Sequence, residues 1–166
     1  FVMVASASMP AADRTFGAPF HFVFRHAIAL GMALTAGLVV FAAPLSWWQR
    51  YGTLLFFVGI ALLILVLVPG VGRSANGATR WIPLGPFNLQ SSELMKFFAV
   101  VYAAGYLVRR REEVATRLTG FIKPMILVVM AATLIMAQPD FGTTAVLMAT
   151  VLGMLFLGGV PVSNFI

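Results

Sequence analysis

The most constraining feature of this chain is its series of long apolar runs without charge, such as residues 51–68. Runs of this kind take the place of the short alternating patterns of a soluble core. Of the 166 residues, 61% are hydrophobic and 10% are charged, whereas a soluble domain carries about 25% charged residues. Because every backbone polar group inside a bilayer must be satisfied internally, such runs fold as helices. The sequence therefore predicts an all-α polytopic membrane protein.

Five spans are expected within a single transmembrane domain, at residues 22–43, 51–68, 92–108, 124–137 and 142–160. The third and fourth fall short of the roughly 17–25 residues that a straight span needs, unless polar ends lie within the membrane zone. That shortfall suggests a protein-lined cavity. Residues 1–8 are too few to span and resemble the tail of a preceding helix, so we expect the chain to be a piece of a longer protein.

Basic residues cluster at the ends of the expected spans. The densest cluster, at residues 109–123, lies in the cytoplasm by the positive-inside rule, and counting backward places residues 47–50 there too. Residues 9–21, 69–90 and 138–140 then face outward. This distribution accounts for the net charge of +6 without any nucleic-acid partner. The cluster consists of Arg109, Arg110, Arg111, Arg117 and Lys123.

Two opposite charges stand at the start of the third span. Glu93 and Lys96 are spaced i, i+3, so they share a helix face and can pair. Ser91 or Ser92 is the expected N-cap, which puts Glu93 in the first turn, where the helix dipole favours an anion. One interpretation is a capped, self-paired helix start. The other is an ion pair lining a polar cavity that opens outward, since a charge at membrane depth is costly unless it is paired or solvated.

Arg80 and Trp81 lie in the connection of residues 69–90, which is rich in Gly and Pro. Long ordered loops are often functional. The planar fork of Arg matches phosphate oxygens, and Trp offers a flat face for a sugar. The alternative is that Trp81 only anchors the loop at the membrane surface.

A tight turn joins the fourth and fifth spans. Pro139 breaks the incoming helix, and Asp140 can cap the outgoing one. A carboxylate near membrane depth is also a functional hypothesis, and both interpretations stay open. No metal site is expected, because the chain has no cysteine and its two histidines, His21 and His26, form no ligand pattern with nearby acids.

Three motifs together resemble the SEDS family of cell-wall proteins, which includes FtsW and RodA. They are NGATRWI at residues 76–82, QSSELMK at 90–96 and QPDFGT at 138–143. Residues 106–110 and 120–124 are more similar to FtsW, the division member, than to RodA, the elongation member. Ser91 departs from the pattern, because the family usually has Pro there.

The resemblance implies a ten-span fold, of which this chain covers the end of span one through span six. It implies a peptidoglycan glycosyltransferase that polymerises lipid II at the outer face of the bacterial cytoplasmic (inner) membrane, at the division septum. Glu93 and Lys96 match the family's cavity ion pair. Arg80 and Trp81 match the outer loop beside it, and Asp140 matches the acid of the span five–six turn. The carboxylate assigned as the base lies in a later outer loop, outside these residues.

The implied partners are lipid II, an FtsI-like class B penicillin-binding protein, other divisome membrane proteins and membrane lipid. No cofactor is assigned, and a divalent cation is left open. We expect Lys96 or Arg80 to bind diphosphate, Glu93 to orient Lys96, and Trp81 to bind the sugar or lipid head. The same cavity would suit a lipid II flippase, and a non-enzymatic divisome scaffold is a third class.

Overall fold

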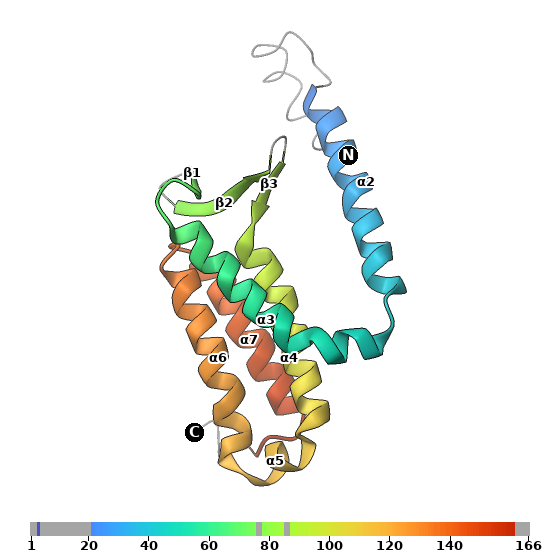
Figure 1. The fold of residues 1–166 in the computed structure, drawn as a ribbon, viewed down its shortest axis with the longest axis vertical. Helices are drawn as coiled ribbons and strands as arrows, with labels where there is room; N and C mark the ends of the chain where they lie inside the picture. The colour runs from blue at the N-terminus through green and yellow to red at the C-terminus, as the bar shows by residue number, and fades with distance from the viewer. Residues whose placement is uncertain (1–2, 4–20, 76–77, 85–86, 162–166) are drawn as a thin grey trace. The chain divides into compact units, whose positions relative to one another are not determined.

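The computed structural model describes residue 3 and residues 21–75, 78–84 and 87–161. The expected tail at residues 1–8 and the outer loop at 9–21 therefore lie almost wholly outside the described residues. The chain divides into two units, Phe1–Pro44 and Leu45–Ile166. The helices, labelled in Figure 1, are α2 (His21–Ala42), α3 (Leu45–Leu67), α4 (Ser91–Arg109), α5 (Arg111–Thr116), α6 (Leu118–Met136) and α7 (Phe141–Leu157).

The composition of the helices is that of a multi-pass membrane protein. Val23–Ala42, Leu45–Leu67 and Leu118–Met136 are each long and apolar enough to cross a membrane, and α7 is a shorter apolar helix. Helix α4 is less apolar, because it carries Glu93 and Lys96 near its start and Arg109 at its end.

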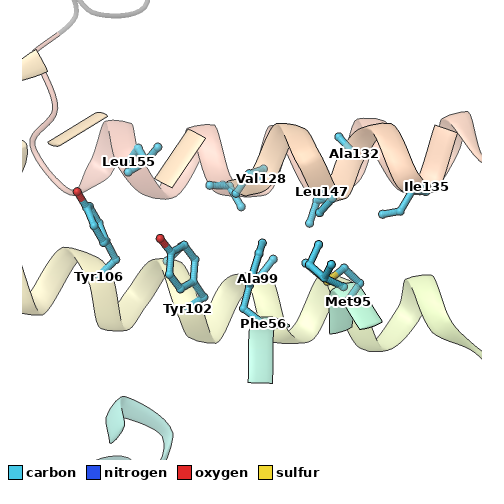
Figure 2. Packing of buried hydrophobic residues seen from close by; sticks show 14 of the residues in the cluster. Phe56, Met95, Ala99, Tyr102, Tyr106, Val128, Ala132, Ile135, Leu147 and Leu155 are labelled. Carbon is cyan, nitrogen blue, oxygen red and sulfur yellow. The ribbon is translucent and has the colours of Figure 1, made fainter. Parts of the chain in front are cut away.

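In the second unit, α3, α4, α6 and α7 form a bundle around one apolar cluster. Close packing of α3 on α4 depends on small residues, since a Cβ at Gly59 would lie 2.6 Å from Met95 Sδ. Small residues serve the same purpose at many contacts between membrane helices. Lipid tails are as apolar as the side chains, so the helices associate largely through close van der Waals packing. Figure 2 shows the layer between α4 and the facing helices, with Met95, Ala99, Tyr102 and Tyr106 opposite Val128, Ala132, Ile135, Leu147 and Leu155.

The connection between α3 and α4 is a three-stranded antiparallel sheet, where the sequence analysis expected only a loop. Its strands are β1 (Arg73–Ala75), β2 (Ala78–Leu84) and β3 (Phe87–Gln90), in the order β1-β2-β3. Two local features of the sequence favour these strands. An Asn-Gly dipeptide stands between β1 and β2 in the sequence and is a strong hairpin signal, and Trp81 and Ile82 are strand-favouring residues.

Two helices begin earlier than predicted. Helix α3 begins at Leu45, so residues 47–50 are helical and are not a loop. Helix α6 begins at Leu118, which places Pro124 inside the helix and turns most of the expected basic loop into α5 and the start of α6. The apolar run marks only part of each helix, which also includes the polar and aromatic residues before that run.

Two helices are longer than the apolar runs behind the expected shortfall, because they include the polar residues at their ends. Helices α4 and α6 have 19 residues each, within the roughly 17–25 that a straight span needs. The cavity inferred from short spans loses that support.

The sheet and α5 lie at opposite ends of the bundle (Figure 1). At the α5 end, Arg109 of α4 donates to the Gln49 carbonyl at 2.7 Å and to Thr53 Oγ1 at 3.2 Å, which joins it to the first turns of α3. At the sheet end, Arg80 of β2 donates to the turn between α6 and α7. The connections that charge counting assigns to opposite sides of the membrane thus occupy opposite ends of this unit.

Candidate functional site

The candidate residues gather at the sheet end of the bundle. Strand β3 runs directly into α4, so Gln90 is both the last residue of β3 and the N-cap of the helix. Strand β2 carries Arg80 and Trp81, and Asp140 begins α7. The site has two parts, a partly exposed ion pair on α4 and a polar network around Asp140.

Glu93 and Lys96 form the ion pair that their spacing predicted. Lys96 Nζ lies 2.8 Å from Glu93 Oε1, and the two side chains are 28% and 56% exposed. Glu93 also lies in the first turn of α4, where the helix dipole stabilises an anion. The ammonium is thus held by a neighbouring carboxylate and still has an open side, an arrangement that suits a cation for an anionic ligand.

The predicted serine cap of α4 is wrong. Gln90 is the N-cap and makes no side-chain cap hydrogen bond, while Ser91 and Ser92 are buried in the first turn. Ser92 Oγ pairs with Gln90 Nε2 at 3.1 Å. Ser91 Oγ has no hydrogen-bond partner within the described ranges. The strand continues to Gln90, so the chain is already helical at the serines and their hydroxyls cannot act as caps.

Asp140 is buried, with 6% of the residue exposed. Its Oδ1 accepts from the Thr143 amide at 3.2 Å, which confirms the predicted N-cap of α7. Its Oδ2 lies 3.4 Å from Gln90 Nε2 and 3.7 Å from Arg80 Nη1. Both oxygens of this carboxylate are therefore engaged by the protein itself.

Arg80 directs its whole guanidinium toward the α6–α7 turn. Its Nε donates to the Gln138 carbonyl at 3.2 Å and its Nη2 to the Pro139 carbonyl at 2.6 Å, while Nη1 faces Asp140. Carbonyls just past a helix C-terminus lack helical partners, and the planar fork of Arg supplies them.

Trp81 lies directly opposite Gln90 in the pairing of β2 with β3. Residues opposite each other in an antiparallel pair project from the same face of the sheet. Trp81 is half-buried, so the structure leaves part of the residue open.

Two glutamines belong to this site although the sequence analysis gave them no role. Gln138 is 1% exposed and donates through Nε2 to the Leu63 carbonyl of α3 at 3.2 Å. Gln90 joins the two parts of the site, because it contacts Asp140 and begins the helix that carries Glu93. A signal was available: each is an amide at a helix boundary, Gln90 just before α4 and Gln138 just after α6, and amide groups removed from water need hydrogen-bond partners.

Among the residues that the structure describes, no group of three or more His, Asp or Glu side chains could hold a metal ion.

Comparison with known proteins gives a consistent result. The family model for cell cycle proteins of the FtsW/RodA/SpoVE type matches residues 1–166. A probable peptidoglycan glycosyltransferase FtsW from Allochromatium vinosum is 58% identical over 166 residues, which are 100% of this chain and 42% of that protein. The chain thus spans less than half the length of this relative.

Solved structures agree. The rod shape determining protein RodA of Thermus thermophilus matches with a TM-score of 0.75 and 26% identity, over 96% of this chain and 52% of that one. A chain from a structure described as coordination of polymerization and crosslinking by a peptidoglycan synthase complex matches with a TM-score of 0.75 and 28% identity, over 96% of this chain and 47% of that one.

Proposed function

This chain belongs to the FtsW/RodA/SpoVE family of cell cycle proteins, and we propose that it contributes one part of a peptidoglycan glycosyltransferase site. The substrate would be lipid II. The observation that carries this proposal is the ion pair of Glu93 and Lys96, 2.8 Å apart and partly exposed at the sheet end of the bundle.

The proposed reaction forms a glycosidic bond. An acceptor sugar hydroxyl attacks the anomeric carbon of the lipid-linked donor, the bond from that carbon to the diphosphate oxygen breaks, and polyprenyl diphosphate leaves. The hydroxyl proton passes to a general base, for which the resemblance implies a carboxylate outside this chain. Positive charge placed where the leaving diphosphate gains negative charge lowers the barrier.

The roles within this chain follow from the hydrogen bonds and ion pairs of each side chain. Lys96 is the cation for the diphosphate, and Glu93 orients its ammonium. Trp81, half-buried on the sheet face that it shares with Gln90, contacts the sugar or the lipid head. No role proposed here depends on a divalent cation.

The proposal extends to place and partners. The relatives are named peptidoglycan glycosyltransferase FtsW, and one matching structure is a peptidoglycan synthase complex. We therefore place the whole protein in the bacterial inner membrane at the division septum. Its proposed partner there is an FtsI-like class B penicillin-binding protein, with other divisome membrane proteins nearby.

The test uses the full-length protein, purified and supplied with lipid II alone. Polymer should form with the parent, and Lys96→Ala should lower the rate by about 100-fold, the usual effect of removing a group that stabilises transition-state charge. Arg111→Ala, an exposed basic residue at the opposite end of the bundle, is the matched control and should polymerise normally. Transport of lipid II without polymer would instead favour a flippase. Neither activity would favour a scaffold.

A further inference from the structure

We propose that Arg80, Asp140 and Gln90 form a clamp that positions the substrate-binding residues, and that neither Arg80 nor Asp140 touches the substrate. The inference rests on the proposed function and changes the role of Arg80. Its phosphate-matching chemistry suggested a ligand for diphosphate, whereas its contacts indicate a positioning residue.

The first support is that the Arg80 guanidinium already contacts the α6–α7 turn. Its three nitrogens face the Gln138 carbonyl, the Pro139 carbonyl and the Asp140 carboxylate. The side chain is 31% exposed, but a diphosphate that took over these donors would draw the guanidinium away from the turn. That movement would leave the buried Asp140 carboxylate without its cation, and an unpaired buried charge is strongly unfavourable.

The second support is that both carboxylate oxygens of Asp140 already contact groups of the protein. Oδ1 is bound by the Thr143 amide, and Oδ2 lies near Gln90 and Arg80. The side chain is 8% exposed, compared with 56% for Glu93. Of these two acids, only Glu93 has a carboxylate open to a ligand. Asp140 therefore acts by positioning Gln90 and Arg80.

The third support is the path from the clamp to the ion pair. Gln90 Nε2 bridges Asp140 Oδ2 and Ser92 Oγ at the point where β3 becomes α4. Because α4 is a continuous helix from Ser91, fixing this start fixes Glu93 and Lys96 relative to α7. Trp81 is held by the same device, since it is paired in register with Gln90.

The deciding variants are Arg80→Lys and Arg80→Gln in the full-length protein. Lys is a good point charge for phosphate but has no planar fork with which to bind two carbonyls and a carboxylate. The clamp predicts that both variants lose at least about tenfold in kcat for lipid II polymerisation, a loss that arises when reacting groups are displaced. Arg110→Gln, which removes the exposed partner of an ion pair with Glu113 at the other end of the bundle, is the matched control and should keep kcat.

Amide hydrogen exchange supplies a readout that does not depend on activity. Both Arg80 variants should exchange faster than the parent at residues 138–144 and 90–96, whereas Lys96→Ala should not change exchange at 138–144. If the parent makes no polymer, the proposed function fails and exchange alone decides the clamp.

Two results would overturn the clamp. Arg80→Lys within about threefold of the parent kcat would show that Arg80 acts by charge, as a phosphate ligand does. Unchanged exchange at residues 138–144 in both variants would show that Arg80 holds nothing there. Arg80→Lys retains the charge that pairs with Asp140, so it keeps the test valid if Arg80→Gln fails to fold.

Discussion

The Lys96 ammonium lies 2.8 Å from the Glu93 carboxylate, one helical turn earlier on α4. Exposed i, i+3 pairs contribute only about 0–1 kcal/mol to stability, and Glu93 is 56% exposed. Glu93→Ala and Lys96→Ala should therefore fold normally. We expect each to lose about 100-fold in polymerisation, because Lys96 would stabilise charge that develops in the transition state.

Comparison of the double variant with the singles tests whether the pair acts as one unit. If Glu93 works only by orienting Lys96, the double variant should be little worse than Lys96→Ala, since groups that act together are not additive. The measurement is polymer yield per folded protein, with the exposed Glu112→Ala as control. Full activity of Glu93→Ala would show that Glu93 has no role in polymerisation and only interacts with the dipole of α4.

Membrane topology gives the second prediction. Residues 109–123 should be cytoplasmic and residues 71–90 outside, because the basic excess lies in the former segment. Gly72→Cys and Ala115→Cys report on the two ends of the bundle, and this chain has no cysteine of its own. In spheroplasts of a cysteine-free full-length variant, an impermeant thiol reagent should label Gly72→Cys only. Labelling of Ala115→Cys alone would show that the spans have the opposite orientation in the membrane.

The sequence predicted the helices better than their ends. Uncharged runs such as residues 51–68 can satisfy their backbone in a bilayer only as helices, so their existence is a strong inference. The start of α3 at Leu45 was missed because Trp48 and Arg50 look like loop residues when hydropathy alone is considered. The sheet was missed for a different reason: its strands are short and lie in a polar connection, so hydropathy does not mark them, and only the Asn-Gly dipeptide indicates a hairpin.

Within the site, contacts between residues close in the sequence were predicted, and contacts between distant residues were not. Glu93 and Lys96 were predicted to pair because helical spacing alone brings them together. Arg80 and Asp140 are far apart in the sequence, and no periodicity places them within 3.7 Å. Such a contact depends on the packing of the sheet over the α6–α7 turn, which a single sequence does not specify.

Substitutions at Asp140 separate the cap from the clamp. Asn is as good an N-cap as Asp, so Asp140→Asn should keep the Thr143 hydrogen bond while losing the charge that faces Arg80. We expect it to express normally and to lose at least about tenfold in polymerisation. Asp140→Ala should lose about 1 kcal/mol of stability as well, because the cap is gone. Parent-like polymer yield from Asp140→Asn would limit Asp140 to capping.

The α5 end supplies a prediction about pH. The hydrogen bond from Lys123 lowers the pKa of Glu113 below its ordinary value, and the charges of Lys123 and Arg110 and a hydrogen bond from Thr119 act in the same direction against desolvation, which raises it. A carboxylate with a depressed folded-state pKa stabilises the fold above its unfolded pKa, about 4.3 for Glu. That stabilisation is lost as the pH falls through the folded-state pKa.

Unfolding midpoints measured downward from neutral pH should therefore fall less steeply in Glu113→Gln than in the parent. The difference should be confined to the region below about pH 5, where the unfolded chain takes up the Glu113 proton before the folded protein does. Glu112→Gln, an exposed neighbour for which no ion pair is seen in the described part of the chain, is the matched control and should follow the parent curve. Identical curves for the parent and Glu113→Gln would remove the proposed linkage.

Three glycines test how closely the helices pack. A Cβ at Gly120 would lie 2.6 Å from Val114 Cα and would also clash with the Glu113 carbonyl, so it would meet backbone that cannot move aside. At Gly59 the obstacle is Met95 Sδ at 2.6 Å, the end of a flexible side chain. At Gly153 nothing lies within 4 Å.

Gly120→Ala should therefore lose about 1–3 kcal/mol of stability through overpacking, Gly59→Ala should lose less, and Gly153→Ala should lose none. The measurement is the thermal unfolding midpoint in detergent, with the three variants prepared in the same full-length background. Gly59 and Gly153 both lie in helix interiors, so intrinsic helix propensity would shift those two variants alike, whereas Gly120 is the third residue of α6. A Gly120→Ala midpoint equal to that of Gly153→Ala would contradict the close approach of α5 and α6, whereas the predicted order would locate the tightest backbone contact at the α5 end.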